Sequence, residues 1–239
     1  MFISSMELTL LGTSSMVPTK ERNVQAMYLE YDGEGILFDC GEGTQRQMNI
    51  CNLNRNKIRK ILISHWHGDH VAGLVGMLQT IGHNMHDEEA KEKHKIQLYG
   101  PQGTKQFMHH LLRCTQQESG KIDIEIHEVE MKHHKFYEND KYELWCAPLR
   151  HSTPCVGYAF VEKDFRKMDM EKAAKYGLKG GRKVGLLSKG EAVEHNGEEI
   201  TPEMVTWIRK GRKFCLVADT GVCNEAVNLA EDADVLVIE

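Results

Sequence analysis

The sequence contains none of the patterns by which a chain is cross-linked or anchored. Its seven Cys are odd in number and form no closely spaced pair, which argues against a disulfide framework and against a zinc ribbon. It has no run of about 18 apolar residues, and no basic segment followed by an apolar one opens the chain. These absences exclude a signal peptide and a membrane span, and we expect a cytoplasmic protein with reduced thiols.

An excess of basic residues is also absent. The 239 residues include 30 Lys and Arg against 35 Asp and Glu, which gives a formal charge of -5. This balance excludes a generally basic surface of the kind that coats nucleic acid, so a phosphate-binding surface must be local. The length suits one domain, with or without an insertion.

Runs of predicted strands are separated by predicted helices. Strands are expected at 7–11, 26–31, 35–39, 60–64, 123–130, 142–147, 156–161, 213–219 and 234–238. Helices are expected at about 43–51, 71–81, 103–114, 201–209 and 224–230. We expect the first strands to begin an antiparallel sheet.

Residues 163–190 differ in character from the rest of the chain. The segment shows no strand alternation, is rich in Gly, and holds nine Lys and Arg against three Asp and Glu. Its net charge is therefore +6, which leaves -11 on the remainder. We interpret it as a flexible basic insertion, although a solvated charged face is the simpler explanation of such a run.

The strongest chemical signal lies directly after the strand predicted at 60–64. There the chain reads His65-Trp66-His67-Gly68-Asp69-His70, with three imidazoles and a carboxylate in one turn. These groups suit Zn²⁺, and ligands on two sides of one turn can hold two ions. A His-rich surface turn is the alternative.

One turn cannot complete two metal sites, so further ligands are expected at other strand ends. His151 lies at the junction of two predicted strands, and Asp219 ends the apolar run that begins at Phe214. Each has a structural alternative, because His151 suits a plain turn and Asp219 suits the N-cap of the next helix.

Together these residues resemble the metallo-β-lactamase superfamily. Within it, several segments resemble ribonuclease Z, the tRNA 3′-processing endonucleases; they are residues 18–23, 37–45, 99–101 and 151–158. The resemblance implies an α/β (α+β) protein: a single domain over 1–239 with a four-layer αββα sandwich and an inserted basic arm at about 163–190.

The resemblance also implies roles for individual residues. One zinc ion would be bound by His65, His67, His151 and Asp219, and a second by Asp69, His70 and the shared Asp219. Mn²⁺ or Mg²⁺ are alternatives to zinc. A hydroxide between the metals would attack the phosphodiester, Asp69 would act as the catalytic residue that orients or deprotonates the water, and Asp39 would steady a ligand His.

The implied RNA contacts lie in two places. One is an early loop with Lys20, Arg22 and Asn23, which a simple β-turn explains equally well. The other is the basic insertion, where the expected contacts are Lys175, Lys179, Arg182 and Lys183.

Three departures from the family pattern limit these expectations. The family's further zinc-binding His lies beyond Glu239, so we expect the last part of the fold to be missing and the second metal to lack a ligand. Ile238 stands where the family commonly has a His that protonates the leaving oxygen. The insertion also lacks the family's Gly-Pro.

Three functional hypotheses follow. The first is a zinc-dependent endoribonuclease that cleaves precursor tRNA. In this hypothesis the protein is a homodimer and has no membrane partner. The second is a hydrolase of the same fold that acts on small phosphodiesters, thioesters or sulfate esters. The third, motivated by Ile238 and by the missing final His, is a metal-binding protein without catalysis.

Overall fold

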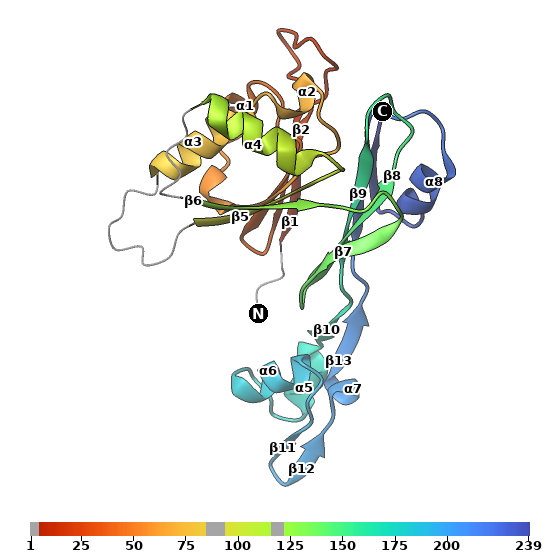
Figure 1. Ribbon diagram of the computed structural model, residues 1–239. Coiled ribbons are helices and arrows are strands. Elements are labelled where there is room, and N and C mark those ends of the chain that lie inside the picture. The colour runs from red at the N-terminus through yellow and green to blue at the C-terminus, as the bar shows by residue number, and fades with distance from the viewer. Residues whose placement is uncertain (1–4, 85–93, 116–121) are drawn as a thin grey trace.

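The computed structural model describes residues 5–84, 94–115 and 122–239. Two mixed β-sheets form its centre. The six-stranded sheet has the order β1-β2-β3-β4-β5-β6, and the five-stranded sheet has the order β15-β14-β9-β8-β7. In Figure 1 the two sheets face each other, with helices outside them.

The strands of the six-stranded sheet are β1 (Met6–Gly12), β2 (Ala26–Tyr31), β3 (Glu34–Phe38), β4 (Ile58–Leu62), β5 (His94–Gly100) and β6 (Ile122–Glu128). Those of the five-stranded sheet are β7 (His134–Glu138), β8 (Tyr142–Pro148), β9 (Val156–Glu162), β14 (Lys213–Val217) and β15 (Val235–Ile238). The helices beside them are α1 (Thr44–Ile50), the 3₁₀ helix η1 (Arg55–Lys57), α2 (Gly68–Val71), α3 (Leu74–Asn84), α4 (Thr104–Cys114) and α8 (Asn224–Ala230).

Side-chain alternation along the strands builds a separate core on each side of each sheet. In β3, Leu37 faces α1, α3 and α4, whereas its neighbours Ile36 and Phe38 face the five-stranded sheet. On the far side, α8 packs on the five-stranded sheet through Ala226 and Leu229. The layers therefore follow the order αββα, which confirms the architecture that the resemblance implies.

A projecting module extends from the five-stranded sheet, downward in Figure 1. It consists of β10 (Phe165–Met168), α5 (Met170–Lys175), α6 (Arg182–Ser188), β11 (Val193–His195), β12 (Glu198–Ile200), α7 (Pro202–Val205) and β13 (Thr206–Arg209). Strand β10 pairs with β13, β11 pairs with β12, and a small apolar core of the module's own lies among them. The module thus continues well past Gly190, where the basic segment ends.

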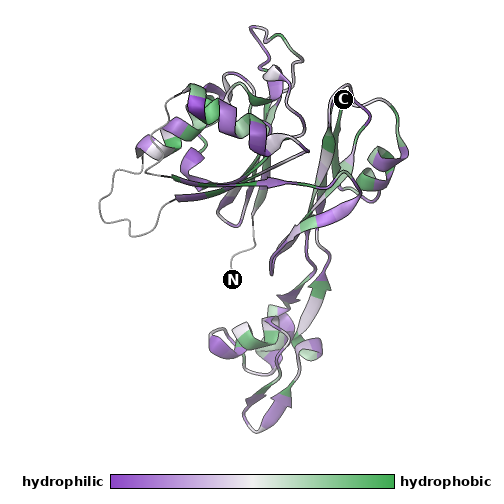
Figure 2. Cartoon of the chain, in the orientation of Figure 1, coloured by the Kyte–Doolittle hydropathy of each residue, from purple (hydrophilic) through white to green (hydrophobic). Residues whose placement is uncertain are grey.

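Charge within the module is divided. Residues 163–190 carry the basic excess, but residues 191–208 hold five Glu and no Lys or Arg. Figure 2 shows the β11–β12 hairpin at the lower tip as largely hydrophilic, and this hairpin carries three of those Glu. The folded module therefore presents a basic and an acidic part and is not uniformly basic.

Three sequence expectations about elements were wrong in part. Strands β1 to β3 are antiparallel as expected, but β4 lies parallel to β3 because α1 and η1 form a crossover between them. The helix expected at 71–81 begins only at Leu74, as α3, and Val71 belongs to the short α2 before it. The helix expected at 201–209 ends at Val205, because Thr206-Trp207-Ile208 favours a strand and pairs with β10.

Among the helices that the structure describes, none has the length and apolar character needed to cross a membrane.

Candidate metal centre

The predicted ligands converge at one edge of the sandwich, where strands from both sheets end. The His65–His70 turn follows β4, His151 lies in the loop between β8 and β9, and Asp219 follows β14. His65, His67, His151 and Asp219 each offer one ligand atom, and these four atoms all lie within 4.8 Å of one another. The structure thus brings together residues that are far apart in the sequence.

Distances among these donor atoms suit a metal ion. His67 Nδ1 lies 2.9 Å from His65 Nε2 and 3.2 Å from His151 Nε2. Asp219 Oδ2 lies 3.8 Å from His65 Nε2 and 3.9 Å from His151 Nε2. Tetrahedral zinc ligands at about 2.0–2.1 Å are separated by about 3.4 Å, so three imidazoles and one carboxylate fit around one ion.

A second group of donors lies beside the first. His70 Nε2 is 3.6 Å from Asp69 Oδ2 and 3.4 Å from Asp219 Oδ1, so the two oxygens of Asp219 face the two groups. Asp69 Oδ1 is buried and has no hydrogen-bond partner in the described part of the chain. A buried carboxylate oxygen without a partner is costly unless a cation or water binds it. The residues therefore also fit a second cation.

Asp39 fixes the orientation of His70. Its carboxylate is fully buried at the end of β3 and accepts hydrogen bonds from His70 Nδ1 (2.8 Å), from Ser64 N (2.7 Å) and from Ser64 Oγ (2.8 Å). A bond at Nδ1 turns Nε2 of the same imidazole toward Asp69 and Asp219. Ser64 is a contributor that sequence reasoning missed, although it directly precedes the His65–His70 turn.

Electrostatics keep two candidate ligands in the forms that bind metal. Burial, together with the neighbouring His70, lowers the pKa of His65 to about 4, so its imidazole is neutral at pH 7. The hydrogen bond from His70 lowers the pKa of Asp219 to about 2, so its carboxylate is ionised. Neutral imidazole and ionised carboxylate are the ligand forms that a divalent cation requires.

His70 experiences the opposite balance. Burial alone lowers its pKa, but the charges and hydrogen bonds of Asp39 and Asp219 outweigh burial and raise the pKa to about 10. The surrounding carboxylates thus favour positive charge at this point.

Two glycines allow the turn to approach β3 closely. Cys40 N donates to His70 O, and Gly73 N donates to Cys40 O. A Cβ at Gly41 would lie 2.1 Å from Asp69 O, and one at Gly73 would lie 2.1 Å from Gly41 O. Only glycine fits at either position. The same contact separates α2 from α3, where the sequence predicted one helix.

The loops that carry His151 and Asp219 are joined to each other. Gly221 N donates to Arg150 O at 2.8 Å, and Arg150 N donates to Thr220 Oγ1 at 3.1 Å. Across the sandwich, Tyr158 Oη donates to Ile63 O and Val156 N donates to Ser64 O. These bonds fix the candidate ligands from the two sheets relative to one another.

One relative is similar enough to show which family this chain belongs to. The ribonuclease Z of Thermococcus kodakarensis is 41% identical over 236 residues, which cover 98% of this chain and 72% of the relative. The chain belongs to the ribonuclease Z family.

Solved structures agree with this family and its fold. Human tRNase Z, short form, superposes with a TM-score of 0.64 at 24% identity, over 96% of this chain and 75% of that one. The metallo-beta-lactamase fold protein YhfI of Bacillus subtilis gives a TM-score of 0.52 at 14% identity, over 66% of this chain and 58% of that one. The four-layer sandwich is therefore a metallo-β-lactamase fold, and this ribonuclease Z-like chain is a hydrolase with a candidate His/Asp metal site.

A second family also includes part of the chain. Residues 6–176 match the family model described as Anti-Pycsar protein Apyc1. Over these residues the chain therefore also belongs to the Apyc1 family.

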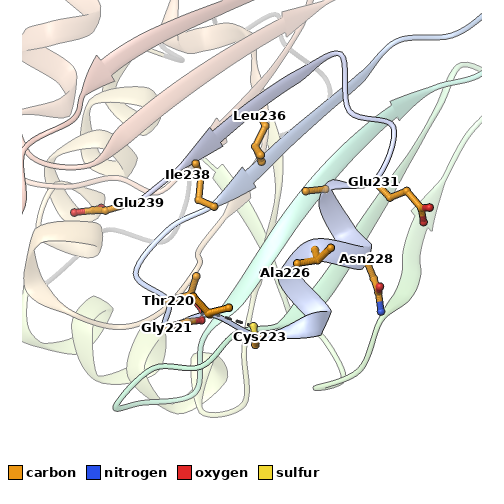
Figure 3. Close-up of a pocket in the computed structure, with 12 residues that line it drawn as sticks. Thr220, Gly221, Cys223, Ala226, Asn228, Glu231, Leu236, Ile238 and Glu239 are labelled. Carbon is orange, nitrogen blue, oxygen red and sulfur yellow. Dashed lines mark hydrogen bonds between the residues drawn. The ribbon is translucent and has the colours of Figure 1, made fainter.

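An apolar groove of about 620 Å³ lies beside the metal centre, between α8 and β15. Figure 3 shows Ala226 and Leu236 on its walls. Thr220, which directly follows Asp219 in the chain, and Glu239 also line it. Burial, together with the charge and hydrogen bond of Asp219, raises the pKa of Glu239. Glu239 is thus a further carboxyl group beside the ligands, one that the expected site residues did not include.

In the early loop, part of the predicted RNA-binding segment has a structural role. Thr19 closes a turn, because its Oγ1 accepts from Arg22 N (2.9 Å) and its N donates to Arg22 O. Asn23 Nδ2 donates to Glu42 O at 2.7 Å, which ties the loop to the turn before α1. Lys20 and Arg22 are exposed.

In the module, the four predicted contacts are separated from the metal centre by the length of β9. Lys175, Lys179 and Arg182 are exposed, and none forms an ion pair within the described residues. Lys183 differs, since its Nζ donates to Glu194 O at 2.7 Å and thereby joins α6 to the β11–β12 hairpin.

Proposed function

We propose that this protein is a zinc-dependent endoribonuclease that removes the 3′ trailer from precursor tRNA. The observation that carries the proposal is the convergence of His65, His67, His151 and Asp219 in a chain of the ribonuclease Z family. A relative named ribonuclease Z supports RNA as the substrate class, and the exposed cations of the module support a phosphate-rich partner.

Zinc bound at these residues acidifies water and neutralises the charge that develops on a phosphodiester. The chain's own residues supply orientation and proton transfer. Asp69, with one buried oxygen that has no partner among the described residues, is placed to accept a proton or to orient the attacking water. Asp39 holds His70 in one orientation. We assign His65, His67, His151 and Asp219 to one ion, and Asp69, His70 and Asp219 to the other, with Mn²⁺ or Mg²⁺ as possible substitutes.

The module supports RNA binding through its cations. Lys175, Lys179 and Arg182 have no ion pair in the described part of the chain, whereas Lys172 pairs with Asp169 and Arg166 with Glu203. Cations without acidic partners can neutralise phosphates, with an affinity that falls as salt rises. We therefore assign the grip on tRNA to part of the basic segment, and not to the whole module.

The decisive experiment incubates the purified protein with 5′-labelled precursor tRNA and Zn²⁺ or Mn²⁺. Cleavage that leaves a 3′-hydroxyl on the tRNA, and that His67→Ala abolishes, is the expected result. No cleavage by the unaltered protein with metal bound would overturn the proposal. It would leave two alternatives, a hydrolase of small esters and a metal-binding protein without catalysis.

A deletion separates the tRNA hypothesis from its alternative. Glu162 N donates to Arg212 O at 2.9 Å, so the two chain ends at the base of the module are neighbours and a short turn can replace residues 163–211. We expect the deletion to weaken tRNA binding strongly and to spare turnover of a small diester. Equal tRNA binding by the deletion variant contradicts the assigned grip.

The alternative function is hydrolysis of a small phosphodiester, thioester or sulfate ester. The match of residues 6–176 to the Apyc1 family suggests nucleotide hydrolysis and so favours a phosphodiester among these. Fast turnover of a cyclic nucleotide, together with no cleavage of precursor tRNA, would support it.

Two further predictions concern the state of the protein in the cell. We expect a homodimer in a cytoplasmic location, and light scattering of the purified protein tests the first.

A further inference from the structure

Outside the metal centre, an aromatic pair reaches from the His65–His70 turn to the surface. Trp66 lies between two candidate ligands, and its ring contacts Phe107 on α4 with centroids 5.3 Å apart and an interplanar angle of 37°. Figure 1 shows α4 on the outer side of the six-stranded sheet. Phe107 is therefore joined directly to the segment that supplies the metal ligands.

A chain of contacts fixes the pair. Trp66 Nε1 donates to Thr104 Oγ1 at 2.8 Å, and Thr104 Oγ1 donates to Pro101 O at 2.7 Å. Trp66 also packs against the core between the sheet and the helices. A Cβ at Gly103 would lie 3.0 Å from the Phe107 ring, so the ring rests over a residue without a side chain.

Phe107 stays 45% exposed in spite of these contacts. Single exposed apolar residues are common on protein surfaces. This one differs because its ring packs against Trp66 of the metal-ligand turn, so it offers an aromatic surface beside the candidate ligands.

The charges on α4 suit a polyanion. The helix carries the exposed cations Lys105 and Arg113, and no acidic residue. The nearby carboxylate of Glu128 is already engaged, because it accepts hydrogen bonds from Gly103 N and Lys105 N. An aromatic surface flanked by cations is the combination that binds single-stranded nucleic acid.

We propose that Phe107, supported by Trp66, is a stacking surface for an unpaired nucleobase of the RNA next to the scissile phosphodiester. The inference rests on the proposed function, because that function places a phosphate of the RNA at the metal centre. Phe107 contributes binding and register, and takes no part in bond cleavage.

Fluorescence anisotropy of a short labelled single-stranded RNA, with the full chain and Zn²⁺, tests the proposal. Phe107→Ala should weaken binding about 5- to 100-fold, the range that corresponds to removal of one stacked base. Phe107→Trp should bind as the unaltered protein does. Phe107→Leu should resemble Phe107→Ala, because leucine restores apolar bulk without a π-face. Ile50→Ala, an exposed change on α1, is the matched control.

RNAs in which one base at a time is replaced by an abasic site locate the contact. The penalty of Phe107→Ala should disappear for one abasic position only. The proposal is overturned if Phe107→Ala binds RNA normally, if Phe107→Leu binds as the unaltered protein does, or if the penalty is the same for every abasic RNA.

The binding measurement keeps this proposal distinct from the proposed function. If precursor tRNA is not cleaved but the Phe107 series behaves as expected, the proposed function fails and the stacking surface stands. If cleavage occurs and the series shows no effect, the proposed function stands and the stacking surface is wrong.

Discussion

The metal centre and the projecting module differ in where their ionisable side chains lie: they are buried in the metal centre and exposed in the module. In the metal centre, ionisable side chains are buried, orient one another and share one small space; Asp39, Ser64 and His70 form a single hydrogen-bonded group. In the module, Lys and Glu are exposed, and the basic part is followed by an acidic part of nearly equal charge. The first arrangement determines geometry, whereas the second determines only which surface attracts a polyanion.

This difference governs how sharply each region should respond to substitution. Removing one member of a buried, hydrogen-bonded group is strongly destabilising, because it leaves the remaining members buried without a hydrogen-bond partner or an opposite charge. Exposed charges act additively and are screened by salt. The following predictions test that contrast, from the largest expected effect to the smallest.

Removal of one metal ligand should have the largest effect. We expect His67→Ala to reduce the rate of tRNA cleavage by about three orders of magnitude or more, because a metal ion supplies several kcal/mol of transition-state stabilisation. Zinc content by mass spectrometry of the native protein should fall in parallel. Cleavage within about tenfold of normal would mean that the cluster is not the catalytic centre.

The base of the module combines both kinds of charge and should show the next largest effect. Glu162 is buried and accepts hydrogen bonds from Arg212 Nε (2.7 Å) and Tyr31 Oη (3.1 Å). Glu162→Gln breaks this pair, and we expect it to lower the free energy of unfolding by about 3 kcal/mol. Urea denaturation at pH 7 measures the change.

The pH dependence of that effect has a definite sign. Burial alone raises the pKa of Glu162, but Arg212 outweighs burial, so the pKa of the folded protein lies below the ordinary value of 4.5. A carboxylate with a lowered pKa stabilises the fold above its ordinary pKa and loses that contribution as the pH falls through the lowered value. The stability difference between Glu162→Gln and the unaltered protein should therefore be complete at pH 7 and shrink below pH 4.5. A difference that grows on acidification would contradict the assignment.

Asp39 should have a smaller effect, because it orients a ligand without being one. We expect Asp39→Asn to weaken zinc affinity or activity about 10- to 100-fold. Chelator competition measures the affinity. Asn keeps the shape of the side chain, so a variant that folds normally and binds zinc normally would show that His70 is held by other contacts.

The module's exposed cations should have the smallest individual effects. Combined substitution of Lys175, Lys179 and Arg182 by Ala should lower the slope of log affinity against log salt by about 0.9 for each phosphate that is no longer neutralised, with little change in stability. The matched control replaces Glu194, Glu198 and Glu199 by Gln. It should leave tRNA affinity equal or higher, and a weaker affinity would argue that the acidic hairpin touches the RNA directly.

The contrast also explains what could be predicted from the sequence. The turn from His65 to His70 is contiguous, so its residue types alone indicate a metal site. His151 and Asp219 were expected because each follows a recognisable strand. Ser64 and Gly41 were missed, because their roles depend on how closely β3 approaches the turn, which no local pattern records.

The module was less predictable. Its basic part stood out by composition, but the Glu-rich part that follows looked like a return to the main domain, and Thr206-Trp207-Ile208 was expected to continue a helix. Strand β13 forms there because β10 lies ready to pair with it, and that pairing partner is about 40 residues earlier in the chain. Contacts that depend on such distant pairing are absent from local sequence.

The hydrogen bond that joins Glu162 to Arg212 has a consequence for how the molecule folds. Strands β9 and β14 are neighbours in the five-stranded sheet, yet 50 positions separate these two residues at their ends. Bringing the ends of so long a flexible loop together is entropically costly. The module has its own apolar core, and once formed it holds its two ends side by side. If the module forms early, it brings the ends of β9 and β14 together before these strands pair. The pairing then costs less loop-closure entropy, so the module would speed folding of the five-stranded sheet.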